Sequence, residues 1–509
     1  MILKLLLYAS FSFIFLSFLS VYWKFIRSSK RIYDTLQSQG IPSEPFVPIV
    51  GQLSELRRRR EHGQLLEYHQ ELTKKHGLIY LFWLGPYSRL VIQEPDLIAD
   101  VVGRTSAQNY MKPVDLGLRL KPIIGIHNLF VSNGTEHERA RKMLNPAFHF
   151  TNLRSMVSIM TYQTQKSIDT LLESSSAINL AIEFNNLTLS IIASSAFGKS
   201  FETMTNAREI VVHGFTEVLS AISYRASRMI TFFPIVSQLP FWKKNIVDKG
   251  TRDVNNFVDQ IITDRRQDRS ESLCASADLL DLLLSAVDTQ GQPFTDQEIK
   301  DQALTFVFAG HETTSNLMIW VIYELMTNPS VYRACQDEVD RILPDGMIPT
   351  YEHLNELHTI EAVLQETLRL YPPAPFFIRQ CIKEQTIGAT TDHPFRIPEG
   401  TIVLTNVYAV HRRSEYWSRP NEFDYTRWLR DPVTNLKPKL AHPFCYLPFA
   451  AGPRNCIGQN FASLEAKVIL AMLVQQCHFQ LEPGQKIVPE IRLTMRPKYG
   501  LLAKITRRR

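Results

Sequence analysis

The segment from Phe449 to Gly458, near the carboxyl end, combines a cysteine with residues that could hold its thiolate against a flat metal cofactor. Gly452 and Gly458 would let the backbone pass close to such a cofactor, because glycine has no side chain. Arg454 could pair with a carboxylate of the cofactor. The next segment has helical character, so Cys456 should lie just before a helix amino terminus, which stabilises an anionic sulfur.

This segment resembles the haem-binding signature F-x-x-G-x-R-x-C-x-G of the cytochrome P-450 superfamily, and all five fixed positions are present. The resemblance implies a mainly α-helical fold with small β-sheets, with haem b as the cofactor and Cys456 as its axial ligand. It also assigns Phe449, Arg454 and Gly458 to cofactor binding. Taken alone, the segment could be a buried cysteine in a glycine-rich turn. Three further motifs in the family's order argue against that interpretation.

The sequence AGHETT, from Ala309 to Thr314, is similar to the family's oxygen-activation motif. Thr313 can donate its hydroxyl proton to the carbonyl of Ala309, four residues earlier, and so perturb the helix there. The resemblance implies that Glu312 and Thr313 are catalytic, as the acid and the hydroxyl that relay protons. Some ω-hydroxylases carry a haem-tethering glutamate where Ala309 stands, so Ala309 indicates haem that is bound non-covalently. Without the cysteine motif, these residues would simply line a buried helix.

A further motif, Glu366 to Arg369, concerns structural support. Glu366 and Arg369 are three residues apart, which on a helix places them on one face. Alone, such a pair would be an exposed ion pair of little energetic value. The resemblance instead implies a buried network behind the haem, in which Glu366 and Arg369 pair with Arg427.

Three more residues are assigned to cofactor binding by resemblance. The segment from Gly134 to Phe148 is similar to a helix that presents W-x-x-x-R to the haem propionates. Arg141 matches the arginine, whereas His137 occupies the place of the tryptophan and could donate a hydrogen bond as indole does. Arg379 matches another propionate-pairing position. The neighbouring Arg139 and Lys142 could help to dock an acidic electron donor, although a solvated helix face is the simpler interpretation.

The elements that must position these residues are mainly helices. Thr295 and Glu298 form a capping-box pattern, which predicts a helix running from there to Thr327 through the AGHETT motif. A second helix is predicted from about Leu357 to Leu370. Short β-rich stretches are expected from Leu78 to Gln93 and from Thr386 to Val403.

The amino-terminal residues 1–23 contain an apolar run, about 5–23, that is long enough to cross a bilayer as a helix. Basic residues follow directly, so the positive-inside rule leaves the rest of the chain in the cytosol. Residues 24–51 read as a basic stop-transfer segment and a proline-rich hinge, and residues 52–509 as a single large catalytic domain. A cleaved secretory signal is the alternative for the first segment, although no A-x-A-like site follows.

The composition excludes several other classes. The net charge of +6 is spread along the 509 residues, so no nucleic-acid partner is indicated. The cysteines are far apart without a C-x-x-C pair, which disfavours a zinc site or a disulfide scaffold. The aromatic-rich stretch from Arg228 to Lys244 is expected either to contact membrane lipid or to be a partly buried connection between helices.

The resemblance implies an endoplasmic-reticulum monooxygenase that inserts one oxygen atom from O₂ into an apolar small molecule. NADPH would supply electrons through a flavoprotein reductase, with cytochrome b5 as an optional donor. One alternative is a same-fold enzyme that rearranges lipid hydroperoxides or endoperoxides without reductase. Another is a non-catalytic membrane haem protein. The sequence does not distinguish a fatty acid, sterol or xenobiotic substrate.

Overall fold

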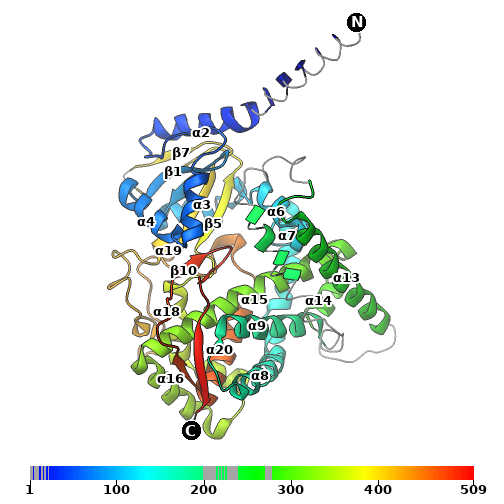
Figure 1. Cartoon of the computed structure of the whole chain (residues 1–509), viewed down its shortest axis with the longest axis vertical. Helices are drawn as coiled ribbons and strands as arrows, with labels where there is room; N and C mark the ends of the chain where they lie inside the picture. Colours follow the sequence, from blue (N-terminus) through cyan, green and yellow to red (C-terminus); the bar gives the residue numbers. More distant parts are fainter. Residues whose placement is uncertain are drawn as a thin grey trace. The chain divides into compact units, whose positions relative to one another are not determined.

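The computed structural model describes residues 4, 8, 11–12, 15–16, 19–20, 22–198, 214–215, 217–218, 220–222, 224–225, 239–269, 278–391 and 393–508 (Figure 1). The chain divides into two compact units. Unit 1 comprises Met1–Pro113 and Phe376–Val410, and unit 2 comprises Val114–Pro375 and His411–Arg509. Both units are described below, and all but one of the predicted site residues belong to unit 2.

Unit 1 is built on a five-stranded sheet with the strand order β1-β2-β8-β5-β3. Strands β2 and β8 run parallel, and the other neighbours in this sheet are antiparallel. The predicted β-rich stretches are confirmed, since they contain β1, β2, β7, most of β6 and the first two residues of β8. The elements of the unit are η1 (Tyr22–Arg27), α2 (Ser28–Gln37), α3 (Leu53–His62), α4 (Leu65–His76), β1 (Ile79–Leu84), β2 (Tyr87–Ile92), α5 (Pro95–Val102), η2 (Ala107–Asn109), β3 (Tyr110–Met111), β5 (Phe376–Cys381), β6 (Gln385–Ile387), β7 (Phe395–Ile397), β8 (Ile402–Asn406) and α19 (Val407–Val410).

Unit 2 is mainly helical, with small sheets of the order β4-β12-β9 and β10-β11. The mainly helical fold class with small β-sheets is thereby confirmed for the described residues. The elements of the unit are α6 (Val114–Ile124), α7 (Gly134–Leu144), η3 (Asn145–Phe148), α8 (Phe150–Glu173), β4 (Ile178–Asn179), α9 (Leu180–Phe197), α13 (Lys244–Arg269), α14 (Leu279–Ser285), α15 (Asp296–Thr327), α16 (Pro329–Ile342), η5 (Pro344–Gly346), α17 (Tyr351–Glu356), α18 (His358–Leu370), η6 (Tyr425–Trp428), η7 (Gly452–Arg454), α20 (Gln459–Gln476), β9 (Cys477–Leu481), β10 (Pro489–Ile491), β11 (Met495–Pro497) and β12 (Leu502–Arg507).

Helix α15 carries the AGHETT motif and spans 32 residues. Thr295 caps its amino terminus: the hydroxyl accepts from the backbone N–H of Glu298, and the Glu298 carboxylate accepts from the N–H of Thr295. The predicted start and end of this helix are confirmed. Helix α18 likewise matches its prediction, because it runs from His358 to Leu370.

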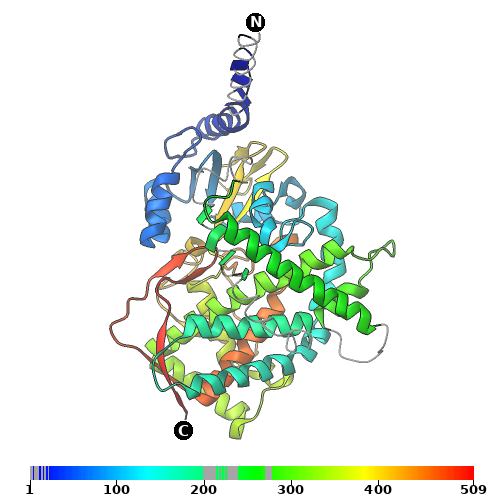
Figure 2. The same cartoon turned by 45° about the vertical axis from the view of Figure 1, so that its right-hand side comes forward.

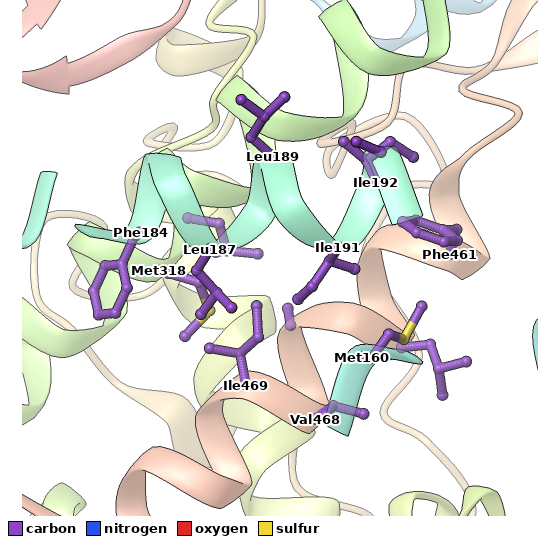
Figure 3. Packing of buried hydrophobic residues seen from close by; sticks show 14 of the residues in the cluster. Met160, Phe184, Leu187, Leu189, Ile191, Ile192, Met318, Phe461, Val468 and Ile469 are labelled. Carbon is purple, nitrogen blue, oxygen red and sulfur yellow. The ribbon is translucent and has the colours of Figure 1, made fainter. Parts of the chain in front are cut away.

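The core of unit 2 lies where helices α8, α9, α15 and α20 pack together. Helices α8 and α9 lie side by side in both overall views (Figures 1 and 2). Figure 3 shows Ile191 of α9 among apolar side chains from the other helices, including Met160 of α8, Met318 of α15 and Ile469 of α20. Burial of these side chains fixes the helix that carries AGHETT against the helix that follows Cys456.

The predicted membrane anchor in residues 1–23 lies mostly outside the described residues. Within the described part of the chain, one helix is long and apolar enough to cross a membrane, Leu180–Phe197. This helix is α9, which is mostly buried in the core of unit 2, so it is a core helix by its packing. Residues 228–238 of the aromatic-rich stretch, for which lipid contact or a partly buried connection was expected, also lie outside the described residues.

Candidate active site

The cysteine loop turns sharply before helix α20. Gly452 has φ +73°, a left-handed conformation that favours glycine. The N–H of Cys456 donates to the carbonyl of Phe449 at 2.9 Å, which closes the loop on itself. Helix α20 begins at Gln459, three residues after Cys456, as the sequence predicted. The loop therefore presents the sulfur at the amino-terminal end of a helix.

Cys456 is an exposed residue whose thiol is surrounded by protein. The residue is exposed, yet burial raises the pKa of its thiol. The backbone N–H of Gly458 and the positive charge of Arg141 oppose this effect and lower the pKa. The stabilisation expected at the helix terminus is thus present, but burial outweighs it. An anionic sulfur here needs a further positive partner, as a metal ion would provide.

Arg141 holds the cysteine loop from helix α7. Its Nη1 donates to the backbone carbonyl of Asn455 at 2.7 Å, and its Nη2 donates to the Asn455 side-chain oxygen at 2.8 Å. Its Nε donates to Asn145 at 3.0 Å. Burial lowers the pKa of Arg141, and the charge of Cys456 raises it. Arg141 therefore positions the residue next to Cys456, in addition to the cofactor contact that the resemblance implies.

Arg454 carries a buried nitrogen without a partner in the described part of the chain. Its Nη2 donates to Asn133 at 2.9 Å, whereas its Nη1 is buried and unpaired. Burial lowers the pKa of Arg454 to about 10, although the Glu138 carboxylate raises it. A buried guanidinium with an open donor is costly unless a carboxylate is bound there.

These observations fit an iron porphyrin. Cys456 is exposed and could supply a thiolate ligand, and the open donor of Arg454 would suit a propionate carboxylate. A Cβ at Gly458 would lie 3.9 Å from the sulfur of Cys456, so a larger side chain would begin beside this sulfur. Within the described residues, no group of three histidine, cysteine or acidic residues could hold a metal ion in another way.

Glu366, Arg369 and Arg427 form the buried network that the resemblance implied. Arg369 donates to both oxygens of Glu366 at 2.8 and 2.9 Å, and both side chains are 0% exposed. Arg427 lies 3.4 Å from Glu366, and Trp428 donates its ring N–H to Glu366 at 2.8 Å. The remaining N–H groups of Arg369 donate to the carbonyls of His411, Pro420 and Glu422. The charges are therefore fully paired.

Helix α15 presents the AGHETT motif with the predicted local hydrogen bond. The hydroxyl of Thr313 donates to the carbonyl of Ala309 at 2.8 Å. On the neighbouring helix α9, the hydroxyl of Thr188 donates to the carbonyl of His311 at 2.9 Å. A Cβ at Gly310 would lie 3.0 Å from Ile192, so the glycine allows α9 to approach closely. Helix α9 thus contacts the backbone of the motif at Gly310 and His311.

Glu312 extends from α15 toward the β10–β11 hairpin. Its Oε1 accepts the hydroxyl proton of Thr494 at 2.7 Å. Thr494 also accepts from the amide of Asn316, which is one helical turn after Glu312. The acid of the motif therefore has a partner that lies far away in the sequence.

The other predicted residues are placed as follows. His137 is buried in the first turn of α7, and Phe449 is half-buried against the core of unit 2. Arg379 is buried on β5 of unit 1, and its part in cofactor binding stays a prediction. Arg139 is half-buried and pairs with Asp288 and Glu298, each at 2.7 Å, whereas Lys142 is exposed as expected for a solvated face.

Several residues around the site were not predicted. Asn133 accepts from Arg454, Asn455 accepts from Arg141, and Thr494 donates to Glu312. Each of these partners is recognised only once the fold is known. Asn316 had a usable signal, because its spacing of four residues from Glu312 places both on one face of α15.

Comparison with known proteins agrees with these features. The family model described as Cytochrome P450 matches residues 41–504. Cytokinin hydroxylase of Arabidopsis thaliana is 29% identical, over 95% of this chain and 94% of its own length. Cytochrome P450 4V2 of Rattus norvegicus is 30% identical, over 87% of this chain and 85% of its own length. Cytochrome P450 734A1 of Arabidopsis thaliana is 30% identical, over 94% of this chain and 92% of its own length. The chain therefore belongs to the cytochrome P450 family and is a monooxygenase that binds haem b through a cysteine thiolate.

Proposed function

We propose that this chain is a membrane-anchored monooxygenase that hydroxylates an apolar small molecule, with Cys456 as the haem ligand. The observation that carries the proposal is the exposed residue Cys456, whose loop directly precedes helix α20. Arg141 contacts this loop, and its charge favours the anionic sulfur. Arg454 lies within the loop, and both guanidinium groups would suit the cofactor's carboxylates. The bound haem would supply the redox chemistry that activates O₂.

The residues of this chain have separate parts in that reaction. Arg454 binds a propionate through its open Nη1, with His137, Arg141 and Arg379 as further propionate partners. Phe449 and Gly458 would contact the cofactor near Cys456, and Ala309 would contact the cofactor without a covalent link to it. Glu312 and Thr313 carry protons to the reaction site, because a carboxyl and a hydroxyl can exchange them in sequence.

Electrons come from NADPH through a flavoprotein reductase, with cytochrome b5 as an optional second donor. Attachment to the endoplasmic reticulum membrane is supported by the apolar side chains in the first 23 residues. Among the described ones, Tyr8, Phe11, Phe15 and Leu16 are exposed. Such a surface is stable in lipid and costly in water. The basic residues that follow favour a cytosolic catalytic part.

The ligand is tested by replacing Cys456 with serine. The reduced wild-type protein should give the red-shifted carbon-monoxide difference spectrum of a thiolate-bound haem, and Cys456→Ser should lose it. Cys445→Ala is the matched control, because Cys445 is a buried thiol in the preceding loop. An unchanged spectrum in Cys456→Ser would contradict the assignment.

The reaction class is tested by incubating the holoenzyme with reductase, NADPH and a panel of fatty acids, sterols and xenobiotics. We expect a product heavier by one oxygen atom, formed only with NADPH. Turnover of a lipid hydroperoxide without NADPH would indicate the isomerase alternative. No turnover over the whole panel would favour a haem-binding protein without catalysis.

A further inference from the structure

The side chain of Glu312 is oriented by the turn between β10 and β11. Thr494 donates its hydroxyl proton to Glu312 Oε1 at 2.7 Å. Asn316 donates from its Nδ2 to the same hydroxyl oxygen at 3.0 Å. A hydroxyl has a single proton, so the bond from Asn316 leaves that proton for the carboxylate. The hydrogen bonds therefore run in one direction, from Asn316 through Thr494 to Glu312.

The turn that carries Thr494 is fastened at several points. Trp320 donates its ring N–H to the carbonyl of Met495 at 3.4 Å, and the N–H of Met495 donates to Pro373 at 3.0 Å. One face of α15 contacts this turn, because the spacing of four residues places Glu312, Asn316 and Trp320 on the same side of the helix. Thr494 is 6% exposed and Asn316 is 4% exposed. Water is therefore largely excluded as a competing partner for the Thr494 hydroxyl.

The hairpin also brings positive charge to Glu312. Arg496 on β11 is partly buried, and burial lowers its pKa, as does the charge of Arg492. The carboxylates of Glu490 and Glu312 raise the pKa of Arg496. Glu312 thus has two interactions with the hairpin, a directed hydrogen bond from Thr494 and a longer-range attraction to Arg496. Only the first of these fixes the position of one oxygen.

We propose that Thr494, oriented by Asn316, is a positioning residue that directs the Glu312 carboxyl for proton transfer. The inference rests on the proposed role of Glu312 as a proton carrier. Because the Thr494 bond occupies Oε1, the proton that Glu312 takes up and passes on resides on Oε2. Thr494 acts only through Glu312.

The test uses Thr494→Val, which keeps the shape but removes the hydroxyl, and Thr494→Ser, which keeps the hydroxyl. The holoenzyme is supplied with reductase and NADPH without added substrate, so that the electrons reduce O₂ either to hydrogen peroxide or to water. Slower proton delivery to the reaction site increases the share of hydrogen peroxide. We expect Thr494→Val to lower the share recovered as water about threefold, as loss of one hydrogen bond would predict, and to raise the solvent isotope effect on NADPH oxidation.

Thr494→Ser should restore both values, whereas a merely structural role would not depend on the hydroxyl. Thr506→Val on β12 is the control, because Thr506 is exposed. Asn316→Leu should resemble Thr494→Val in part, because it frees the Thr494 hydroxyl to rotate. Failure of Thr494→Ser to restore the water share would overturn the proposal.

A second readout does not depend on turnover. Glu312→Gln, Thr494→Val and the double variant form a double-mutant cycle on the free energy of unfolding, measured with urea on the holoenzyme. Non-additive effects are expected if the bond is formed, and additive effects would overturn it. If Thr494→Val behaves like the wild type while Glu312→Gln releases more peroxide, only the positioning role is wrong. If Glu312→Gln also has no effect, the proposed proton carrier and this inference both fall.

Discussion

His411 joins the buried Glu366–Arg369 pair to Leu447, two residues before the segment from Phe449 to Gly458. Its Nε2 accepts from the backbone N–H of Leu447 at 2.7 Å, and its Nδ1 donates to the carbonyl of Arg369 at 3.1 Å. The imidazole is fully buried, which lowers its pKa to about 3. The neutral ring therefore holds two segments that are 36 and 42 residues away in the sequence.

Replacing His411 with phenylalanine should destabilise the protein by roughly 1–3 kcal/mol at pH 7, because the N–H of Leu447 is then buried without a partner. In the wild type, the neutral His411 ring contributes to the free energy of unfolding above its unfolded-state pKa of 6.5. This contribution is lost as the pH falls toward 3, since in this range only the unfolded state binds the proton. From pH 7 to pH 5 this loss should be roughly 2 kcal/mol. Urea unfolding at the two pH values measures it.

The control for His411→Phe is His62→Phe, at an exposed position on α3. This variant should keep the pH dependence of the wild type. Equal slopes in the wild type and in His411→Phe would show that His411 is not the group whose protonation differs between the folded and unfolded states.

Arg369→Met should destabilise the fold by about 3–5 kcal/mol, because Glu366 would be left as a buried charge without its main partner. The variant should also lose haem more readily, since Arg369 holds the carbonyls of His411 and Pro420. Arg57→Met is the matched control: Arg57 pairs with Glu61 on the surface of α3, where such pairs contribute up to about 1 kcal/mol. Similar losses of unfolding free energy in the two variants would contradict the argument.

Arg454→Met should have opposite effects with and without haem. In the haem-free chain, it removes a buried guanidinium with an unpaired Nη1, so the stability should be unchanged or higher. In the holoenzyme, it removes the proposed propionate partner, so transfer of haem to apomyoglobin should become about tenfold faster. Faster transfer together with a strongly destabilised apoprotein would indicate a general folding role instead.

Glu465 on α20 is 1% exposed, and its oxygens have no well-formed hydrogen bond within the described residues. Burial raises its pKa to about 8, although the nearby hydroxyl of Thr314 opposes this. The folded state thus holds a proton that the unfolded state releases above about pH 4.5, so stability should fall as the pH rises from 4.5 to 8. Glu465→Gln should remove this fall and stabilise the protein by on the order of 3 kcal/mol at pH 7.

Glu482→Gln, at an exposed position after β9, is the control for Glu465→Gln. It should leave the pH dependence unchanged. If Glu465→Gln falls in stability with rising pH as steeply as the wild type does, another group is responsible for the slope.

The contacts that the sequence predicted are mostly local. The Thr295–Glu298 cap and the Thr313–Ala309 bond join residues three or four positions apart, and helical geometry alone brings them together. The Glu366–Arg369 pair is equally local, although only the family resemblance indicated that it is buried.

The contacts that were missed join distant segments. Thr494 lies 182 residues from Glu312, and Asn133 lies 321 residues from Arg454. A side chain in a turn gives no local sign of such a partner, since packing of the whole unit decides which segments meet. Ala450, which takes φ +56° in the cysteine loop, was missed for a similar reason: its conformation is imposed by the loop and is unusual for alanine.

Thr313→Ala tests the proposed proton delivery. The variant should keep the carbon-monoxide difference spectrum, because Cys456 is untouched, but it should release a larger share of its reducing equivalents as peroxide. Thr327→Ala is the matched control on the same helix: its hydroxyl donates to the carbonyl of Tyr323 at 2.9 Å, the same contact that Thr313 makes with Ala309. Both variants lose an equivalent hydrogen bond, so a difference in peroxide between them reports on the position of the hydroxyl. Fully coupled turnover in Thr313→Ala would remove Thr313 from the mechanism.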